Sequence, residues 1–561
     1  MILGIWDGHD AGACLVDPEA GRIVCAVNEE RLTRRKLEVG FPTRAIETCL
    51  KLSSDISEVA ATTTDPAKTL TRVFPSMKEK YYLLRRRKLR PKALDPLKRA
   101  FKYNLTTWRP NAVSSALSEH ALGKELARVG LGGSKLRWVP HHLAHAASAA
   151  YTSGYSDALV VTLDGVGDGL SGSLSVLRDG KLSPMSYIPA RHSLGIFYEH
   201  VTQLMNMREL EDEGKVMALA AYGHPVDPDQ NPLMDLFHLE GSTLRCRLGP
   251  LRLKRFLARE LAMVPSEQFA WMAQRVLETN VAKLVAGALR ETGMSRVVYA
   301  GGVASNIQAN LKLKELPGLD ELFVFPHMGD GGLALGAALA RAVSGGGTAS
   351  FSLGDLRLGP EVSAESVERS LDASGLARSK PGCIATEAAS RLARGEIVLW
   401  FQGRMEYGPR ALGGRSILAR PDRPELRDRL NSTLKRRVWY QPFCPSILDD
   451  EAERLLEHGD MPNRFMTMAY RVRPEARDVL AGVISSDGTC RPQMVDKSYG
   501  KYYELLKTLR ESVGVGAVLN TSFNVHGEPM VSSPDDALST FARCGADALV
   551  IGDFLVEPPR S

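Results

Sequence analysis

The stretch that decides the fold is LVVTLDGVGDG at residues 159–169, which continues into the alternating run SLSVL at residues 173–177. An apolar run that ends in Asp-Gly and leads into a second β-rich run is typical of a β-hairpin with polar residues at the strand end. The same scheme opens the chain, where residues 2–6 lead into DGHDAG at residues 7–12 and then into two further β-rich runs. Either hairpin alone carries little information, but the pair indicates an internal duplication.

Two such hairpins facing one another form the phosphate-binding half of the nucleotide-binding fold of actin, sugar kinases and Hsp70. In that class of fold, strand-end carboxylates and backbone amides surround phosphates and a metal ion. We therefore expect a mixed α/β (α+β) protein with an N-terminal domain of this ATPase fold. The sequence AGGVASN at residues 300–306 agrees with this, because glycines between a strand and a helix let adenosine approach the backbone.

A group of metal-ligand residues accompanies the second hairpin. His141 and His145 are four residues apart, so on a helix their Cβ atoms would lie about 5–6 Å apart on one face. Asp164 ends a strand, and Asp330 lies in the turn GDGG after another apolar strand. A lone His-x-x-x-His pair is more often a pair of surface or core histidines. The two strand-end aspartates favour a metal site.

Length and composition limit the classes of protein to which this chain can belong. A chain of 561 residues exceeds the range of a single core, and the linker-like SGGGTAS at residues 344–350 suggests domains at 1–350 and 351–561. Eight cysteines without a Cys-x-x-Cys argue against a disulfide framework or a zinc ribbon. No apolar run reaches the length of a membrane-spanning helix and no leader is evident, so we expect a cytoplasmic protein.

The net charge of +6 is concentrated in a basic insertion near residues 76–110. Residues 78–109 hold twelve basic and two acidic residues, together with five aromatic residues. Such a segment could contact an anionic acceptor, an anionic membrane surface or nucleic acid, and the plain alternative is a solvated helical surface.

The C-terminal half contains an arginine and glycine loop, QGRMEYGPRALGGRSI at residues 402–417. Arginine presents a rigid fork to phosphate or carboxylate, so this loop favours anion binding over a solvated loop. The basic run KRR at residues 435–437 and the polar run NTSFN at residues 520–524, which follows an apolar strand, are further candidates for ligand contacts.

Taken together, these motifs resemble the O-carbamoyltransferases of the NodU, CmcH and TobZ type. The matching motifs run in family order over nearly the whole chain: GHDA (8–11), NEERLTR (28–34), FP (41–42), HHLAHA (141–146), EGK (213–215), AAYG (220–223), GGVASN (301–306), GDGG (329–332), GPRALG (408–413) and NTSFN (520–524).

The resemblance implies two half-reactions on two domains. A C-terminal YrdC-like domain would make carbamoyl-adenylate from carbamoyl phosphate and ATP, with Mg²⁺ accompanying the ATP. An N-terminal domain similar to the enzyme of tRNA threonylcarbamoyl-adenosine synthesis would carry a divalent metal, expected to be Fe²⁺. There an acceptor hydroxyl of a natural product, sugar or glycolipid would take the carbamoyl group. No obligate nucleic acid is expected, and the chain could form a homodimer.

The resemblance also implies roles for individual residues. The metal ligands would be His141, His145, Asp164 and Asp330. The adenylate would contact Gly301, Gly302, Asn306, Gly331 and Gly332. Carbamoyl phosphate and the ATP phosphates would be handled by Arg410, Lys435, Arg437 and Asn520, with Arg404, Arg415, Ser522 and Asn524 as further cofactor contacts. His9, Asp10 and Lys36 would serve the acceptor side, with His9 as proton acceptor or orienter, although a structural role for His9 is nearly as well supported.

Three other functions stay open at this point. Carbamoylation of a maturation-factor cysteine, as in HypF, is disfavoured because the chain has no zinc-finger Cys-x-x-Cys motif. A tRNA-modifying role would use the basic segment to hold RNA, with a steep dependence on salt. A non-catalytic nucleotide-binding module would leave the arginine and glycine loop unexplained.

Overall fold

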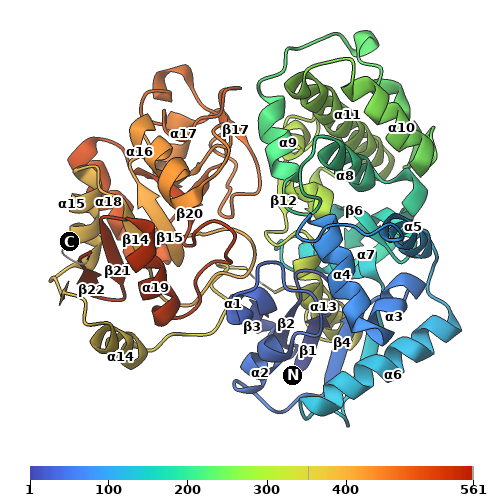
Figure 1. The fold of residues 1–561 in the computed structure, drawn as a ribbon, viewed down its shortest axis with the longest axis horizontal. Helices are drawn as coiled ribbons and strands as arrows, with labels where there is room; N and C mark the ends of the chain where they lie inside the picture. The colour runs from blue at the N-terminus through green and yellow to red at the C-terminus, as the bar shows by residue number, and fades with distance from the viewer. Residues whose placement is uncertain (352, 559–561) are drawn as a thin grey trace. The chain divides into compact units, whose positions relative to one another are not determined.

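The computed structural model describes residues 1–351 and 353–558, with the backbone alone at Pro96 and Arg99. The chain forms two compact units (Figure 1). Unit 1 comprises Met1–Glu29 and Leu37–Leu353, and unit 2 comprises Glu30–Lys36 and the described residues from Gly354 onward. The sequence gives no sign that the short segment Glu30–Lys36 packs with the second unit.

The first sheet of unit 1 has the strand order β3-β2-β1-β4-β5. The first three strands form an antiparallel meander, and β4 and β5 continue the sheet in parallel with β1. The strands are β1 (Ile2–Trp6), β2 (Gly12–Asp17), β3 (Arg22–Asn28), β4 (Glu58–Thr62) and β5 (Lys135–Val139).

The second sheet of unit 1 repeats this plan, with the order β8-β7-β6-β11-β12. Again three antiparallel strands are followed by two parallel strands beside the first. The strands are β6 (Ala158–Gly167), β7 (Leu170–Arg178), β8 (Lys181–Pro189), β11 (Arg296–Ala300) and β12 (Glu321–Val324). The predicted duplication is confirmed and extends to five strands in each half, so the predicted mixed α/β class with an actin-like and sugar-kinase-like first unit is confirmed.

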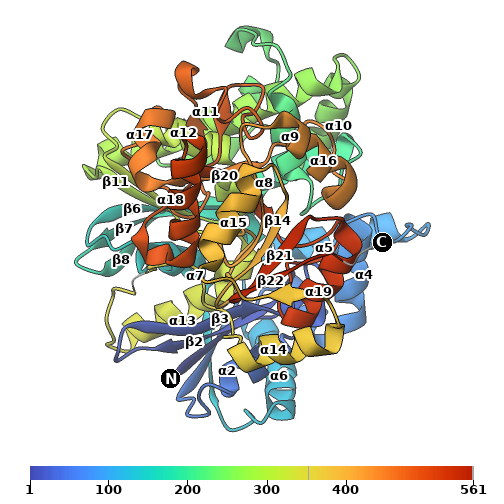
Figure 2. The same ribbon diagram turned by 90° about the vertical axis from the view of Figure 1, so that its left-hand side faces the viewer.

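Two helices rich in small residues connect the halves. Helix α7 (His141–Ala150) follows β5 but packs on β6 and β11, whereas α13 (Leu333–Ser344) follows β12 but packs on β1, β2 and β4 (Figure 2). The two helices touch, and a Cβ atom on Gly336 would lie 1.9 Å from the carbonyl oxygen of Ala144. This close crossing requires glycine and brings the start of α7 to the strand ends of the second half.

The other helices of unit 1 pack on these sheets and on one another. The longest, α11, ends at Gly293 in the left-handed conformation that glycine favours. Among the described residues, no helix has both the length and the hydrophobicity needed to cross a membrane. The remaining elements of unit 1 are α1 (Glu29–Thr33), α2 (Thr43–Leu50), α3 (Pro66–Val73), α4 (Pro75–Arg85), α5 (Asp95–Thr106), α6 (Ala112–Arg128), α8 (Leu194–Leu204), α9 (Glu213–Ala220), β9 (Phe237–Glu240), β10 (Thr243–Cys246), α10 (Pro250–Leu261), α11 (Ser266–Thr292) and α12 (Ile307–Lys314).

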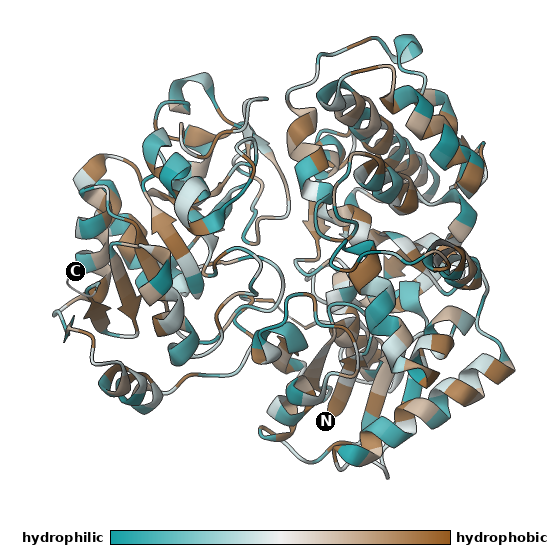
Figure 3. Ribbon diagram, in the orientation of Figure 1, coloured by the Kyte–Doolittle hydropathy of each residue, from teal (hydrophilic) through white to brown (hydrophobic). Residues whose placement is uncertain are grey.

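Unit 2 is built on a mixed eight-stranded sheet with the order β13-β22-β21-β14-β15-β20-β16-β19. Two helices, α15 and α18, pack together and contribute to one hydrophobic core with strands of the sheet, centred on the fully buried Trp400. Hydrophobic residues concentrate in the strands of both units (Figure 3). The main elements are α14 (Ala364–Ser374), β13 (Arg378–Ser379), α15 (Ile384–Ala393), β14 (Val398–Phe401), β15 (Arg415–Ala419), α16 (Pro424–Arg429), β16 (Cys444–Leu448), α17 (Ala452–Leu455), β19 (Gln493–Val495), α18 (Lys501–Val513), β20 (Ala517–Ser522), α19 (Pro534–Cys544), β21 (Ala548–Ile551) and β22 (Phe554–Val556).

Candidate functional site

Two histidines and two aspartates meet in unit 1, as the sequence predicts. One ligand atom from each of His141, His145, Asp164 and Asp330 lies within 4.8 Å of all the others. The His141 Nε2 atom is 3.2 Å from Asp164 Oδ2 and 3.7 Å from Asp330 Oδ1. The His145 Nε2 atom is 3.7 Å from Asp330 Oδ1. Three separate elements, α7, β6 and the turn after β12, therefore converge on one point.

Hydrogen bonds to neighbouring residues hold residues of the cluster in place. The backbone N–H of Gly302 donates to Asp164 Oδ1 at 2.8 Å. The backbone N–H of His141, at the first residue of α7, donates to Asp168 Oδ2 at 2.7 Å. Such outer contacts orient ligand side chains and are costly to lose in metal sites.

The histidines and aspartates of the cluster shift one another's pKa values. Burial lowers the pKa of His141, but the hydrogen bond to Asp164 and the charge of Asp330 outweigh it and raise that pKa to about 9. For Asp164, burial raises the pKa, yet His141 and His145 lower it well below the ordinary value. The site therefore stabilises carboxylates next to positive charge.

The donor set fits a divalent metal ion. The Nε2 atom of His145 is buried and has no hydrogen-bond partner among the described residues, although it faces both carboxylates. A buried nitrogen without a partner is costly unless something binds it. Two imidazoles and two carboxylates suit first-row metals such as iron and can leave further coordination positions open.

His9 lies beside this cluster, with Nδ1 3.5 Å from Asp330 Oδ2. Burial lowers the pKa of His9, which favours the neutral imidazole that a proton acceptor needs. Asp10 has a left-handed backbone, and its carboxylate lies so close to Gly331 that a Cβ there would be 2.5 Å from Oδ2. Both predicted acceptor-side residues of the first turn thus reach the cluster.

Sequence reasoning missed Tyr82, which lies next to His9, and Lys102, which lies over the tyrosine rings. The ring of Tyr82, on α4, lies 5.2 Å from the His9 ring between centroids. The Nζ atom of Lys102, on α5, lies 5.4 Å from the Tyr82 ring centroid and 3.6 Å from that of Tyr81. Burial lowers the pKa of Lys102 to about 7, with a contribution from the charge of Arg85. Their only sequence signal was their place in the basic insertion.

Much of the basic insertion is neutralised within unit 1. Arg85 pairs with Glu199 and also with Glu209, at 2.6 Å from the latter, and Arg86 pairs with Glu211. These pairs use carboxylates more than a hundred residues away in sequence. The inner part of the insertion is therefore structural.

The strand-end aspartate of the first hairpin has different partners. Asp7 is 5% exposed, and its carboxylate lies 2.9 Å from both Lys68 Nζ and Arg72 Nε. Lys78 Nζ lies 3.7 Å away and also donates to the Asp7 carbonyl oxygen. Burial raises the pKa of Asp7, but the three cations lower it well below the ordinary value.

The predicted nucleotide-contacting residues shape the backbone around the cluster. Gly301 has a φ of 96°, and a Cβ there would lie 2.2 Å from the carbonyl oxygen of Leu163. Asn306 caps α12 and shares two hydrogen bonds of 2.9 Å with Gln274. A Cβ at Gly331 or at Gly332 would lie 2.2 Å from atoms of His327. Each residue has a structural reason to be there, and nucleotide contact stays a prediction.

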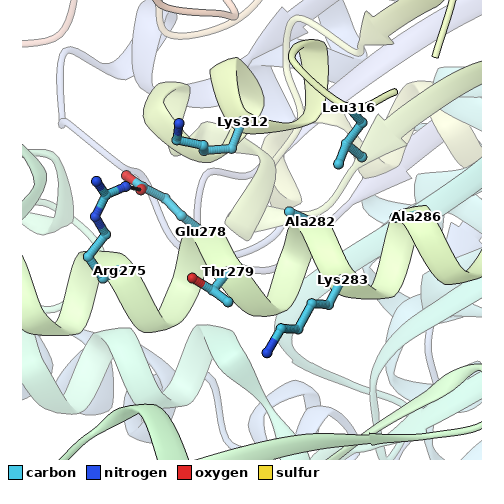
Figure 4. A pocket seen from close by; sticks show the side chains of 8 residues that line it. All are labelled: Arg275, Glu278, Thr279, Ala282, Lys283, Ala286, Lys312 and Leu316. Atoms are coloured by element: carbon cyan, nitrogen blue, oxygen red, sulfur yellow. Dashed lines mark hydrogen bonds and ion pairs between the residues drawn. The ribbon is translucent and has the colours of Figure 1, made fainter. Parts of the chain in front are cut away.

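A groove of about 380 Å³ runs between α11 and α12 (Figure 4). Its floor is apolar, with Ala282, Ala286 and Leu316, and Lys283 stands at its edge. Glu278 lies in the same groove and accepts a hydrogen bond of 2.8 Å from Gln274, which binds Asn306. The groove thus adjoins the predicted adenosine-binding segment.

Three arginines of unit 2 form a positive cluster. Arg410, Arg437 and Arg491 are half-buried, and none has a carboxylate ion-pair partner among the described residues. Burial lowers the pKa of Arg410 to about 9 and that of Arg437 to about 10, and Arg491 adds to both shifts. Arg491 donates to Cys444 Sγ at 2.8 Å. Sequence reasoning missed Arg491 because no motif surrounds it.

Lys435 lies on the same unit, held by the polar run after β20. Its Nζ atom donates to the Ser522 carbonyl oxygen and to Asn524 Oδ1 at 2.7 Å. Burial lowers the pKa of Lys435 well below its ordinary value, and Arg437 and Lys36 lower it further. Lys36 therefore acts electrostatically in unit 2, whereas the sequence grouped it with His9 and Asp10.

The arginine and glycine loop differs from the predicted anion cradle. Its backbone N–H groups at Leu412, Gly414 and Arg415 all donate to the buried carboxylate of Glu406, at 2.7–3.1 Å. An internal carboxylate thus occupies these three amides, whereas the predicted anion binding concerned the arginine side chains. Of the three loop arginines, only Arg410 remains available.

Three residues that we predicted as ligand contacts make structural hydrogen bonds. Arg415 is fully buried and donates to the carbonyl oxygens of Gln402, Gly403 and Gly414. Arg404 donates to the carbonyl oxygens of Leu358 and Gly359 at 2.9 and 2.6 Å. Asn520 is 2% exposed, and its amide donates to Ala411 O and Ser446 Oγ. All three side chains thus hold the scaffold, and ligand contact by them stays a prediction.

Comparison with known proteins agrees with this two-unit arrangement. A family model described as "Carbamoyltransferase N-terminus" matches residues 1–339, and one described as "Carbamoyltransferase C-terminus" matches residues 389–558. The nodulation protein NolNO of Sinorhizobium fredii is 34% identical over 98% of this chain and 79% of its own length. Nodulation protein NolO of Bradyrhizobium diazoefficiens is 38% identical over 74% of this chain and 78% of its own.

Among solved structures, full-length HypF in its phosphate- and nucleotide-bound form aligns with 62% of this chain and 56% of its own, at 14% identity and a TM-score of 0.36. Assignment rests on the family models and on the nodulation proteins. The chain belongs to the carbamoyltransferase family.

Proposed function

We propose that this carbamoyltransferase is an ATP-dependent O-carbamoyltransferase that works in two steps. In the first step, water hydrolyses carbamoyl phosphate to carbamate and phosphate, a carbamate oxygen then attacks the α-phosphorus of ATP, and pyrophosphate leaves. The product is carbamoyl-adenylate. In the second step, an acceptor hydroxyl attacks the carbamoyl carbon, AMP leaves with the bonding electron pair, and the hydroxyl proton passes to a base.

The observation that carries this proposal is the arginine cluster of unit 2. Arg410, Arg437 and Arg491 bring three guanidinium groups together, and no carboxylate of the described residues forms an ion pair with them. Half-buried cations of this kind are costly unless an anion binds, and their forked donors suit phosphate oxygens. Both substrates of the first step, carbamoyl phosphate and ATP with Mg²⁺, are such anions. Arginine also stabilises charge that develops during phosphoryl and nucleotidyl transfer.

The cluster of unit 1 suits the second step. His141, His145, Asp164 and Asp330 would hold a divalent metal, which we propose is Fe²⁺, and when bound it would supply Lewis acidity for polarising a carbonyl group. His9, with a lowered pKa and a position 3.5 Å from Asp330, would accept the proton of the acceptor hydroxyl. Tyr82 would orient the His9 ring.

The first step can be tested without an acceptor. We expect Arg491→Ala to reduce pyrophosphate release from ATP and carbamoyl phosphate by roughly 10²–10³-fold, the loss typical of one removed charge-stabilising donor. Arg369→Ala, at an exposed position on α14, is the matched control and should retain the wild-type rate. Mass spectrometry would identify carbamoyl-adenylate. Unchanged pyrophosphate release in Arg491→Ala would refute the assignment of unit 2.

A further inference from the structure

Helix α5 turns its apolar side outward. Leu97 and Phe101, one helical turn apart, are 72% and 60% exposed. Leu94, just before the helix, lies one turn from Leu97 and is 65% exposed, and Trp108, two residues after the helix, is 60% exposed. A surface helix in a monomeric protein ordinarily buries such a stripe.

The inner side of α5 is the polar one. Asp95 is buried, with Oδ1 2.8 Å from Lys80 Nζ on α4. Lys102 packs over the ring of Tyr81, also on α4. Because these contacts hold the helix to α4, the apolar stripe is a fixed feature of the folded unit.

Positive charge surrounds the stripe. Arg90 and Lys92 precede α5, Lys98 lies within it and Arg109 follows it, and all four side chains are exposed. The two acidic residues of the insertion do not balance them, since Asp95 is buried and only Glu79 is exposed. We call the surface formed by residues 89–109 the α5 surface.

The chemistry of the α5 surface favours one partner. An anionic bilayer offers negative headgroups for the lysines and arginines and an acyl boundary for leucine, phenylalanine and tryptophan. A second copy of the chain would bring two basic surfaces together. RNA would leave Leu94 and Leu97 without a suitable contact, because bases stack on aromatic rather than aliphatic side chains.

We propose that the α5 surface docks the enzyme on an anionic lipid bilayer, so that the acceptor hydroxyl belongs to a lipid-linked molecule at that surface. Helices α4 and α5 connect the α5 surface with the cluster beside His9, since Tyr82 of α4 contacts His9 while α5 carries the exposed stripe. The docking itself is independent of the chemistry, whereas the assignment of the acceptor rests on the proposed carbamoyl transfer.

The test is co-sedimentation of the full chain with vesicles. We expect binding to vesicles of equal parts phosphatidylcholine and phosphatidylglycerol, and none to phosphatidylcholine alone. The double variant L97E/F101E should bind at least about tenfold more weakly. The double variant R90E/K98E should lose roughly fivefold or more for each charge and show less dependence on salt. Leu251→Glu, at an equally exposed leucine on α10, is the matched control and should bind as the wild type does.

Several outcomes would overturn the proposal. These are equal binding by wild type and L97E/F101E, equal binding to neutral and anionic vesicles, a dimer in sedimentation equilibrium that L97E/F101E abolishes, and retention of RNA in place of vesicles. Pyrophosphate release from ATP and carbamoyl phosphate should be unchanged in every variant. If wild type releases none, the proposed function fails whatever the vesicles show.

Discussion

The two halves of unit 1 share strand order and each places an aspartate at the end of its first strand, but Asp7 and Asp164 have different neighbours. Asp7 is neutralised by Lys68, Arg72 and Lys78, all from the helices that follow β4. Asp164 faces two histidines of α7 and a second carboxylate.

This difference shows how one scaffold yields both a structural and a chemical site. Lysine and arginine carry fixed charge and fill the space beside Asp7, so no cation is needed there. Imidazoles can be neutral donors, and beside Asp164 the His145 Nε2 atom is buried without a hydrogen-bond partner among the described residues. The duplicated turn is thus a salt cluster in the first half and a candidate metal centre in the second.

The largest expected effect is a difference in unfolding free energy between variants of the two aspartates. Asp7→Asn leaves three buried cations without their carboxylate, which should cost about 3–5 kcal/mol of unfolding free energy. Asp164→Asn keeps an acceptor for the Gly302 N–H but removes the charge that faces His141. Because that imidazole can become neutral, the cost should be smaller, about 1.5–3 kcal/mol in the metal-free protein. Urea unfolding of both variants measures this. Equal losses would contradict the distinction.

The second prediction concerns metal affinity. Asp164→Asn removes one charged ligand, so Fe²⁺ affinity should fall at least about 100-fold, more than the loss of an outer contact. Lys68→Met alters the other turn and should leave metal affinity unchanged. Anaerobic calorimetric titration of both proteins distinguishes them. A similar loss in Lys68→Met would mean that the two turns are not independent.

A smaller effect is expected from the cations around Asp7. Burial lowers the pKa of Lys68, which shows that its charge is costly there despite Asp7. Lys68→Met leaves Arg72 and Lys78 to pair with Asp7, so the loss should be about 1 kcal/mol, well below that of Asp7→Asn. Chemical denaturation gives the comparison, and a loss as large as that of Asp7→Asn would show that Lys68 alone carries the cluster.

The smallest effect is the acid dependence of stability. Because the folded-state pKa of Asp7 is lowered, its contribution is present above the unfolded-state pKa of about 3.9 and is lost as pH falls toward the folded-state value. Wild-type unfolding free energy should therefore drop more steeply than that of Asp7→Asn below about pH 4. Parallel slopes in urea titrations at each pH would argue against a lowered pKa at Asp7.

Sequence reasoning succeeded where short patterns carry the information. The two hairpins, the His141 and His145 pair and the turn at Asp330 all lie in local motifs, and the structure brings them together. The partners of Asp7 could not be predicted in this way, since Lys68 and Arg72 lie some sixty residues further along the chain in a sequence of ordinary composition.

Unit 2 also shows what local sequence motifs cannot predict. The sequence predicts that arginines of the loop around Arg410 bind an anion. In the structure, the buried carboxylate of Glu406 already accepts hydrogen bonds from backbone amides of this loop. Arg491 joins Arg410 and Arg437 only through tertiary packing, so no sequence motif could identify it. Fully buried Arg415 shows that composition alone cannot separate a scaffold arginine from a ligand-binding one.

The most direct test of the account is metal binding and adenylate formation in one variant, His145→Ala. We predict that wild type binds one Fe²⁺ per chain under anaerobic conditions, that the variant binds none, and that both proteins form carbamoyl-adenylate from ATP and carbamoyl phosphate at the same rate. A variant that still binds the metal, or one that loses adenylate formation along with it, would contradict the division of chemistry between the two units.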